Sequence, residues 1–177
     1  KCNRLSFSEK DKYNVDNLLA TIGSKGKHIA FAGHTDVVPP GYETSWTYPP
    51  FSATIADGKL YGRGTEDMKG NIACFISATN SFLKKYSKDF GGQISFIITG
   101  DEEKEAINGT IKMMKWTKEK KIKFDHCIIG EPTSNKNVGD KLKIGRRGSI
   151  NFFIKVKGIQ GHTANAYRAE NPAHHLI

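Results

Sequence analysis

The stretch HIAFAGHTDVVPP, residues 28–40, decides the fold that this 177-residue chain predicts. Its first six residues, His28 to Gly33, are mostly small or apolar and indicate a buried strand. His34 and Asp36 follow at the C-terminal end of that strand, and in an extended backbone residues two positions apart point to the same face. His34 can therefore offer one ring nitrogen to a metal ion while Asp36 holds the other ring N–H, as metal-binding histidines commonly require.

The rest of the chain predicts strands and helices that alternate around this strand. Four further stretches are typical of strands: residues 2–7, 14–22, 93–100 and 126–129. Apolar residues recur at helical spacing over Asn71 to Tyr86 and over Ile107 to Glu119, which predicts two amphipathic helices. Strands that alternate with helices in this way indicate an α/β fold, a three-layer sandwich with a mixed, largely parallel sheet flanked by helices.

Between these elements, residues 37–51 are rich in proline and residues 61–70 in glycine, so both predict ordered loops. Residues 55–60, with Asp57-Gly58 at their centre, predict a small hairpin. Ile150 to Lys157 alternates apolar and polar side chains, which predicts a half-exposed antiparallel strand. We expect a catalytic domain over 1–147, and the start of a second, α+β domain over 148–177.

Composition sets limits on the class of protein. The hydrophobic share of 37% and charged share of 25% are ordinary globular values, and no stretch approaches the roughly 18 apolar residues of a membrane span. The N-terminus carries no apolar segment typical of a signal peptide and no initiator methionine, so we expect part of a longer, cytoplasmic protein. Three scattered cysteines predict reduced thiols, with Cys74 and Cys127 as small core residues.

The formal net charge of +9 raises the question of nucleic-acid binding. Lysine supplies most of the basic residues, and it is spread along the chain with no recognisable RNA- or DNA-binding motif. The one local cluster, residues 115–124, is typical of a solvated helix end. We therefore expect no nucleic-acid partner and no membrane partner.

Acidic residues mark the ends of the predicted strands and the glycine-rich loop: Asp36, Asp67, Asp101, Glu102, Glu103 and Glu131. In open α/β sheets ligands gather beyond the C-terminal ends of strands. Nitrogen and oxygen ligands without thiolates suit zinc, cobalt or manganese. In the Glu102-Glu103 pair, one carboxylate can bind a metal ion while the other contacts the attacking water as a general base.

Each acidic residue also has an ordinary structural explanation. Asp67 could cap the helix that follows it, Glu102 and Glu103 could be surface residues at a strand exit, and Glu131-Pro132 could be a turn. Only their combination and order favour a metal site.

Five segments carry a resemblance: GHTDVVPPG (33–41), GRGTEDMKG (62–70), TGDEE (99–103), GEPTS (130–134) and GRRGS (145–149). They resemble the signature segments of the co-catalytic di-zinc aminoacylase and carboxypeptidase family. The resemblance implies two zinc ions, with cobalt as a possible substitute, bound by His34, Asp67, Glu103 and Glu131. It further implies that Asp67 bridges the ions, that the peptide bond after Asp67 is cis, and that Asp36 orients His34.

The same resemblance implies the remaining catalytic and binding roles. Glu102 is the general base and acid, His162 stabilises the oxyanion in the partner subunit of a homodimer, and Arg146, with Arg147, binds a substrate carboxylate. Within the family, the segments are most similar to those of members that hydrolyse N-succinyl-LL-2,6-diaminopimelate to succinate and LL-2,6-diaminopimelate in lysine biosynthesis. The expected partner is thus a small N-succinyl amino-acid substrate.

Some alternatives stay open, and the chain also departs from the family pattern. An acetylornithine deacetylase, a related amidohydrolase or a non-catalytic relative would carry much the same segments. The family's C-terminal histidine ligand is not in this chain, and His174 and His175 do not stand in its motif. The residues after His162 differ from the commoner continuation. We therefore expect these 177 residues alone to be inactive.

Overall fold

The computed structural model describes residues 1–9, 13–87, 89–145, 148, 150 and 152–176. By contacts between Cα atoms, the chain separates into two compact units, Lys1–Asp140 and Lys141–Ile177. The predicted domain boundary after residue 147 falls inside the second unit.

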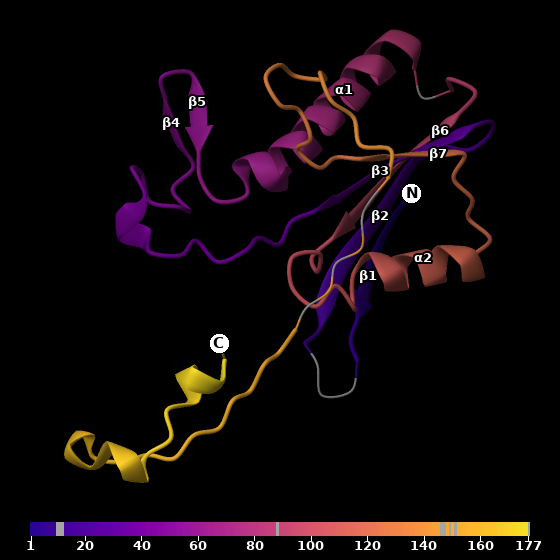
Figure 1. Cartoon of the computed structure of the whole chain (residues 1–177). Helices are drawn as coiled ribbons and strands as arrows, with labels where there is room; N and C mark the ends of the chain where they lie inside the picture. Colours follow the sequence, from indigo (N-terminus) through magenta and orange to yellow (C-terminus); the bar gives the residue numbers. More distant parts are fainter. Residues whose placement is uncertain (10–12, 88, 146–147, 149, 151, 177) are drawn as a thin grey trace. The chain divides into compact units, whose positions relative to one another are not determined.

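The first unit is built on one five-stranded sheet (Figure 1). In sheet order, its strands are β1 (Cys2–Phe7), β2 (Val15–Gly23), β6 (Gln93–Thr99), β3 (His28–His34) and β7 (His126–Ile129). β1, β2 and β6 pair antiparallel, whereas β6, β3 and β7 pair parallel. The predicted mixed sheet is confirmed, but it is not largely parallel, because β1 and β2 join it by antiparallel pairing. Its parallel part consists of the three strands that lead into His34, the Glu102-Glu103 pair and Glu131.

Helices α1 (Gly70–Tyr86) and α2 (Thr110–Glu119) lie on opposite sides of this sheet (Figure 1). Adjacent residues of β3 show why, because successive side chains of a strand point to opposite faces. Ala30 belongs to the buried cluster that contains Met113 of α2. Phe31 belongs to the other buried cluster and stacks on Phe75 of α1, with 4.5 Å between ring centroids. The predicted three-layer sandwich is thus confirmed.

The predicted hairpin is confirmed as β4 (Thr54–Ala56) and β5 (Lys59–Tyr61), which pair antiparallel. Asp57 and Gly58 connect them with φ angles of 50° and 72°. Two positive φ angles in a two-residue loop match the right-handed twist of the flanking strands.

Helix α2 begins at Thr110, three residues later than the sequence predicts. The reason lies in the preceding loop, where the Asn108 N–H donates to the Asp101 carboxylate at 2.8 Å. Gly109 then takes non-helical φ and ψ angles of −101° and −123°, so the helix begins only after it.

Both cysteines that the sequence assigned to the core are exposed, so this prediction was wrong. In α1, Ile72 and Phe75 pack on the core and Thr79 is buried, which turns Cys74 outward. Cys127 lies in β7, a strand at the edge of the sheet whose four residues are all exposed. Burial in that strand depends on a neighbour that sequence alone does not identify.

The second unit holds little regular structure in its described residues. An isolated bridge joins Ile159 to Glu170, and short 3-10 turns span Thr163–Arg168 and Pro172–His175. The strand expected over 150–157 is not formed by the residues that the structure describes there, and Phe153 is 99% exposed. An alternating segment becomes a strand only when another strand pairs with it.

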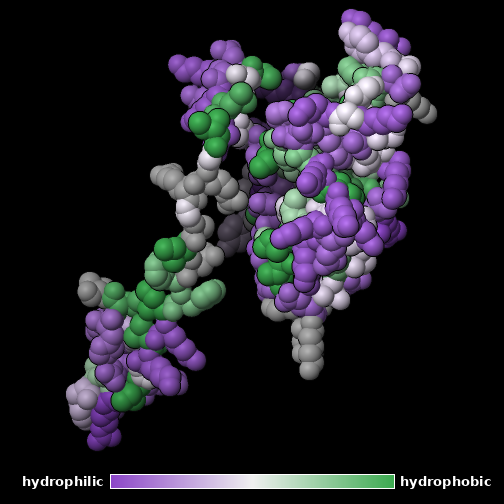
Figure 2. Space-filling model, turned by 90° about the vertical axis from the view of Figure 1, so that its right-hand side faces the viewer, coloured by the Kyte–Doolittle hydropathy of each residue, from purple (hydrophilic) through white to green (hydrophobic). Residues whose placement is uncertain are grey.

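The lysines near the end of α2, such as Lys115, Lys118 and Lys120, are exposed, as expected for a solvated helix end. The face shown in Figure 2 is predominantly hydrophilic over the first unit. Among the described residues, no helix has the length and apolar character required to cross a membrane.

Candidate metal centre

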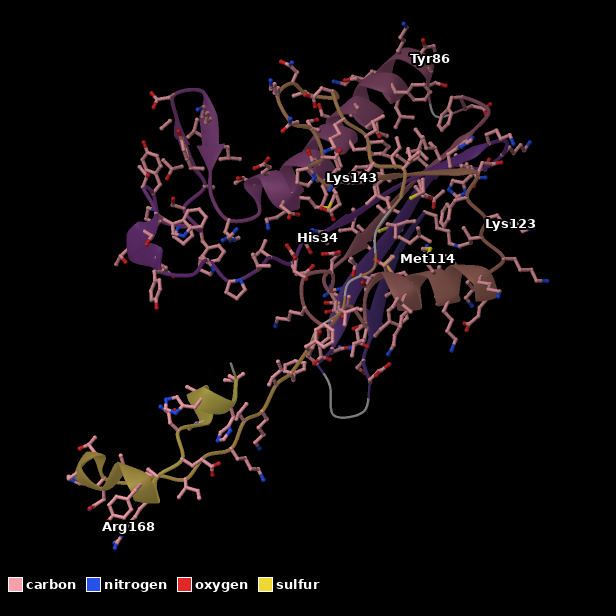
Figure 3. All side chains as sticks on the ribbon, in the orientation of Figure 1. His34, Tyr86, Met114, Lys123, Lys143 and Arg168 are labelled. Carbon is pink, nitrogen blue, oxygen red and sulfur yellow. The ribbon has the colours of Figure 1, made fainter. Side chains whose placement is uncertain are left out.

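His34 is the residue around which the candidate site is built (Figure 3). It ends β3 and is 1% exposed. Its Nδ1 lies 2.9 Å from the main-chain oxygen of Asp36. A carbonyl oxygen only accepts hydrogen bonds, so Nδ1 carries a proton and donates it. In the neutral ring, Nε2 then presents a lone pair.

Two carboxylates face this Nε2 atom. Asp67 Oδ1 lies 3.0 Å from it, and Glu131 Oε1 lies 3.6 Å from it. Ionised carboxylate oxygens are acceptors only, so a neutral His34 would place lone pairs against lone pairs. A positive charge between these atoms, either a ring proton or a metal ion, removes the conflict.

Asp67 reaches His34 from the turn Thr65–Lys69 before α1, where the backbone kinks and Asp67 takes non-helical φ and ψ angles of −111° and 96°. The peptide bond from Asp67 to Met68 is cis, as the resemblance implied. Lys69 occupies the N-cap of α1 and makes no side-chain cap hydrogen bond there. Asp67 therefore does not serve as the cap of α1; its carboxylate bonds the His34 ring instead.

Asp36 connects His34 to the acidic pair after β6. Its Oδ2 accepts the main-chain N–H groups of both Glu102 and Glu103, each at 2.9 Å. The sequence predicted that the Asp36 side chain would hold the His34 ring. The structure differs in detail, because the main-chain oxygen of Asp36 makes that hydrogen bond and Asp36 Oδ1 lies 3.5 Å from Nδ1.

Glu131 follows β7, and two contacts fix the peptide before it. The Gly130 N–H donates to the Ala32 oxygen at 2.9 Å, which continues the pairing of β7 with β3. Asn71, in the first turn of α1, donates from Nδ2 to the Gly130 oxygen at 2.6 Å. Asn71 was not singled out in the sequence, where a polar residue in a first helical turn carries no specific signal.

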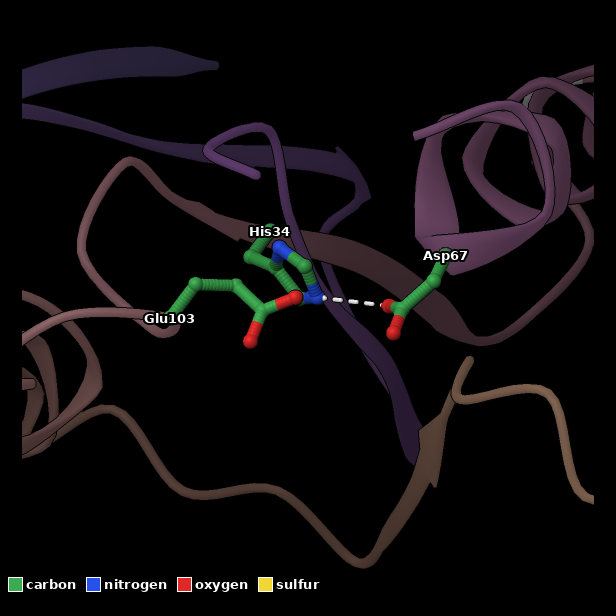
Figure 4. A group of neighbouring side chains, drawn as sticks. All are labelled: His34, Asp67 and Glu103. Atoms are coloured by element: carbon green, nitrogen blue, oxygen red, sulfur yellow. Dashed lines mark hydrogen bonds and ion pairs between the residues drawn. The ribbon is translucent and has the colours of Figure 1, made fainter. Parts of the chain in front are cut away.

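Together these elements bring five side chains of the predicted site into two groups that share His34. One group is His34, Asp67 and Glu103 (Figure 4), and the other is His34, Glu102 and Glu131. Within each group, one ligand atom per residue lies within 4.8 Å of the others. A set of imidazole nitrogen and carboxylate oxygens fits zinc or cobalt and excludes a thiolate site.

The electrostatics of the cluster favour a bound cation. Burial lowers the pKa of His34, but the Asp36 carbonyl and the surrounding carboxylates outweigh it and raise that pKa above its ordinary value. Burial and the nearby charge of Asp67 raise the pKa of Glu103 and of Glu131. Crowded carboxylates resist ionisation together, and a divalent cation among them would relieve the repulsion.

The remaining predicted residues lie outside this cluster. His162 lies in the second unit, where its Nδ1 accepts the Ala164 N–H at 3.1 Å. Arg146 and Arg147 lie outside the described residues. The roles of all three stay predictions.

A protein-family model matches most of this chain. The model described as peptidase family M20/M25/M40 matches residues 30–174, a range that contains the whole cluster. This chain belongs to the peptidase family M20/M25/M40. The predicted membership of a metal-dependent hydrolase family is therefore confirmed.

Full-length relatives of this M20/M25/M40 chain carry a common name. Over 171 residues this chain is 55% identical to the succinyl-diaminopimelate desuccinylase of Methylorubrum populi. The matched region is 97% of this chain and 44% of that protein. Over 173 residues it is 54% identical to the protein of the same name from Nitrobacter hamburgensis, covering 96% and 44%. The chain spans less than half the length of these curated relatives.

Solved structures agree on the fold. Human carnosine dipeptidase 1 matches with a TM-score of 0.59 and 28% identity, over 72% of this chain and 29% of that one. An M20 family metallo-carboxypeptidase from Sulfolobus solfataricus matches with a TM-score of 0.56 and 26% identity, over 71% and 28%. The sandwich of the five-stranded sheet with α1 and α2 is thus a metallopeptidase fold of this family.

Proposed function

We propose that the full-length protein hydrolyses the amide bond of N-succinyl-LL-2,6-diaminopimelate, releasing succinate and LL-2,6-diaminopimelate for lysine biosynthesis. Relatives more than half identical to this chain carry the name of that activity. The single structural observation in support is the His34 ring, whose Nε2 faces acceptor oxygens of Asp67 and Glu131 at 3.0 and 3.6 Å. That arrangement suits a resident cation, which would bind the Nε2 lone pair and the facing carboxylate oxygens together.

The proposal assigns His34, Asp67, Glu103 and Glu131 to two divalent ions, zinc or cobalt. When bound, such ions polarise an amide carbonyl and acidify water. The residues fit such ions, because His34, Asp67 and Glu103 each offer a donor atom within 4.8 Å of the others, and Glu131 lies equally close to His34 and Glu102.

Glu102 takes the catalytic role in this proposal. Its main-chain N–H is held by Asp36 beside the cluster, and its carboxylate lies in the group with His34 and Glu131. From there Glu102 accepts the proton of the attacking water and later gives it to the departing amine of the substrate. Asp36 keeps the loop of Glu102 and the ring of His34 in a fixed relation.

The finer parts of the proposal concern residues outside the metal cluster and the assembly of the full-length protein. His162 donates to the developing oxyanion in the site of a second subunit, and Arg146, with Arg147, pairs with a carboxylate of the substrate through its forked donors. The protein acts as a cytoplasmic homodimer.

Substrate turnover by the full-length protein tests this proposal. Purified protein loaded with zinc or cobalt is expected to release succinate from N-succinyl-LL-2,6-diaminopimelate, to lose the activity with a chelator, and to regain it with metal. N-acetylornithine serves as the competing substrate. Faster release of acetate than of succinate would favour the deacetylase alternative, and no amide hydrolysis by metal-loaded protein would contradict the enzymatic proposal.

A further inference from the structure

Asp101 is a buried carboxylate that the proposed chemistry does not use. It is 1% exposed and directly precedes Glu102. Its Oδ1 accepts the Tyr13 hydroxyl at 2.6 Å, and its Oδ2 accepts the Asn108 N–H at 2.8 Å. A buried charge needs such partners, because an unpaired one would cost several kcal/mol or more. The Asp101 carboxylate therefore ties Tyr13 and Asn108 to the end of β6.

The three residues are bonded pairwise into a closed ring. Asn108 completes it by donating from Nδ2 to the main-chain oxygen of Tyr13 at 3.1 Å. Asn108 is fully buried, and its own main-chain oxygen accepts Asn17 Nδ2 of β2 at 3.1 Å. The ring thereby closes the loop 101–108 at its base and fastens it to the segment that leads into β2.

The loop that this ring closes carries both acidic residues of the site. Glu102 and Glu103 leave β6 within it, in a stretch that is neither helix nor strand. On the side of the site, Asp36 Oδ2 holds their two N–H groups at 2.9 Å. The loop is thus held at two places: by Asp36 at the N–H groups of Glu102 and Glu103, and by the ring of Tyr13, Asp101 and Asn108 at its two ends.

We propose that the ring of Tyr13, Asp101 and Asn108 positions Glu102 and Glu103, and that the Tyr13 hydroxyl sets the direction in which their loop leaves β6. This inference rests on the proposed function, because it takes Glu102 as the general base and Glu103 as a metal ligand. Tyr13 comes from the segment before β2, 88 residues earlier in the chain, and it bonds the Asp101 side chain through its hydroxyl. Without it, Asp101 keeps its hold on Asn108 but loses the link that fixes the direction in which the loop leaves β6.

The test is Tyr13→Phe in the full-length protein, which removes one hydroxyl and keeps the ring packing. Tyr86→Phe is the matched control, because Tyr86 ends α1, is 51% exposed and packs on Phe82. The first readout is cobalt binding in the absence of substrate. Partners that support a metal site typically change affinity or activity by about 10–100-fold, so Tyr13→Phe is expected to weaken binding of one cobalt ion by about tenfold. Tyr86→Phe is expected to bind cobalt like the wild type.

The second readout is kinetic, at saturating cobalt. Tyr13→Phe is expected to lower kcat about tenfold with KM within twofold of the wild type, measured at a temperature at which both proteins are fully folded. Wild-type cobalt affinity together with wild-type kcat would overturn the inference. So would a loss of activity that merely follows a loss of folded protein.

The two proposals fail in different ways. A wild-type protein that binds cobalt but does not hydrolyse the succinyl substrate would remove the proposed function, while the cobalt isotherm of Tyr13→Phe still decides whether the ring positions Glu103. Asp101→Asn extends the test, because the amide can accept from Tyr13 but cannot accept from both partners; it is expected to weaken cobalt binding at least as much as Tyr13→Phe.

Discussion

The strand β3 carries a buried histidine at each end, and the two rings lie in opposite surroundings. His28, at the N-terminal end, is 4% exposed, and its Nε2 lies 2.7 Å from the Ser95 hydroxyl. His34, at the C-terminal end, is 1% exposed, and its Nε2 faces carboxylates of Asp67 and Glu131. In both rings Nδ1 bonds a main-chain oxygen, of Lys123 and of Asp36 respectively.

This difference shows how the group that faces a buried histidine sets the charge that the ring needs. The Ser95 hydroxyl can donate to a lone pair, so a neutral His28 is fully satisfied and needs no further partner. The carboxylates at His34 cannot donate, so that ring requires a positive charge at Nε2. The two rings share residue type, strand and burial. They differ in the group that faces Nε2, which is a hydroxyl that can donate at His28 and carboxylates that only accept at His34.

The largest expected effect comes from the acidic cluster at the C-terminal end. Glu102→Gln removes the proposed proton acceptor but keeps the side-chain shape, and is expected to lower kcat by roughly 10²–10⁴-fold, the usual contribution of a general acid–base group. Metal content, measured on the same preparation of full-length protein, should stay near that of the wild type. Normal turnover by this variant would contradict the role of Glu102.

Glu103→Ala addresses the metal rather than the proton. Because Glu103 belongs to the group of His34 and Asp67, its removal is expected to lose one of two bound ions while the ion near Glu131 remains. Metal analysis after dialysis measures the number of metal ions bound per protein chain. Retention of both ions at wild-type affinity would exclude Glu103 as a ligand.

His28→Ala sharpens the comparison from the other end of β3. Its loss leaves the Ser95 hydroxyl and the Lys123 carbonyl without their His28 hydrogen bonds, and the free energy of unfolding is expected to fall by about 1–3 kcal/mol. Metal content of the folded variant should not change. Denaturant unfolding and metal analysis together give the result, and a loss of metal without a loss of stability would invalidate the contrast with His34.

The smallest effect concerns Asp125, the carboxylate near His28. Asp125 accepts from Lys27 Nζ and from the His28 N–H, both at 2.8 Å. The bond from Lys27 is the main cause that lowers the pKa of Asp125 below its ordinary value of 3.8. A lowered folded pKa means that the contribution to stability is present above the unfolded pKa and is lost as the pH falls through the folded one.

Asp125→Asn is therefore expected to unfold at a lower temperature than the wild type near neutral pH, and the gap should close as the pH falls below the ordinary pKa of an aspartate and through the lowered one. Because the pair is largely exposed, the gap should be small. Thermal unfolding across this pH range is the measurement. A gap that widens on acidification would mean that Asp125 is not stabilised as a carboxylate.

Much of the fold follows from local sequence. The apolar run before His34 predicts β3, helical spacing from Ile72 to Phe82 predicts α1, and Asp57-Gly58 predicts the hairpin; the structure contains all three. Each of these signals is local, since period, turn residues and breakers act over a few positions. The predictions that were wrong, the buried cysteines and the strand over 150–157, depend on neighbours that are distant in sequence.

The sequence by itself determined which residue types are present and where the chain places them: a histidine and carboxylates at the ends of parallel strands. Only the tertiary structure decided what each group faces. It placed two carboxylates against the His34 ring, gave the Asp36 side chain to the N–H groups of Glu102 and Glu103, and closed their loop with Tyr13. The physical reason is that hydrogen bonding and charge act over a few ångströms, between residues that the fold brings together.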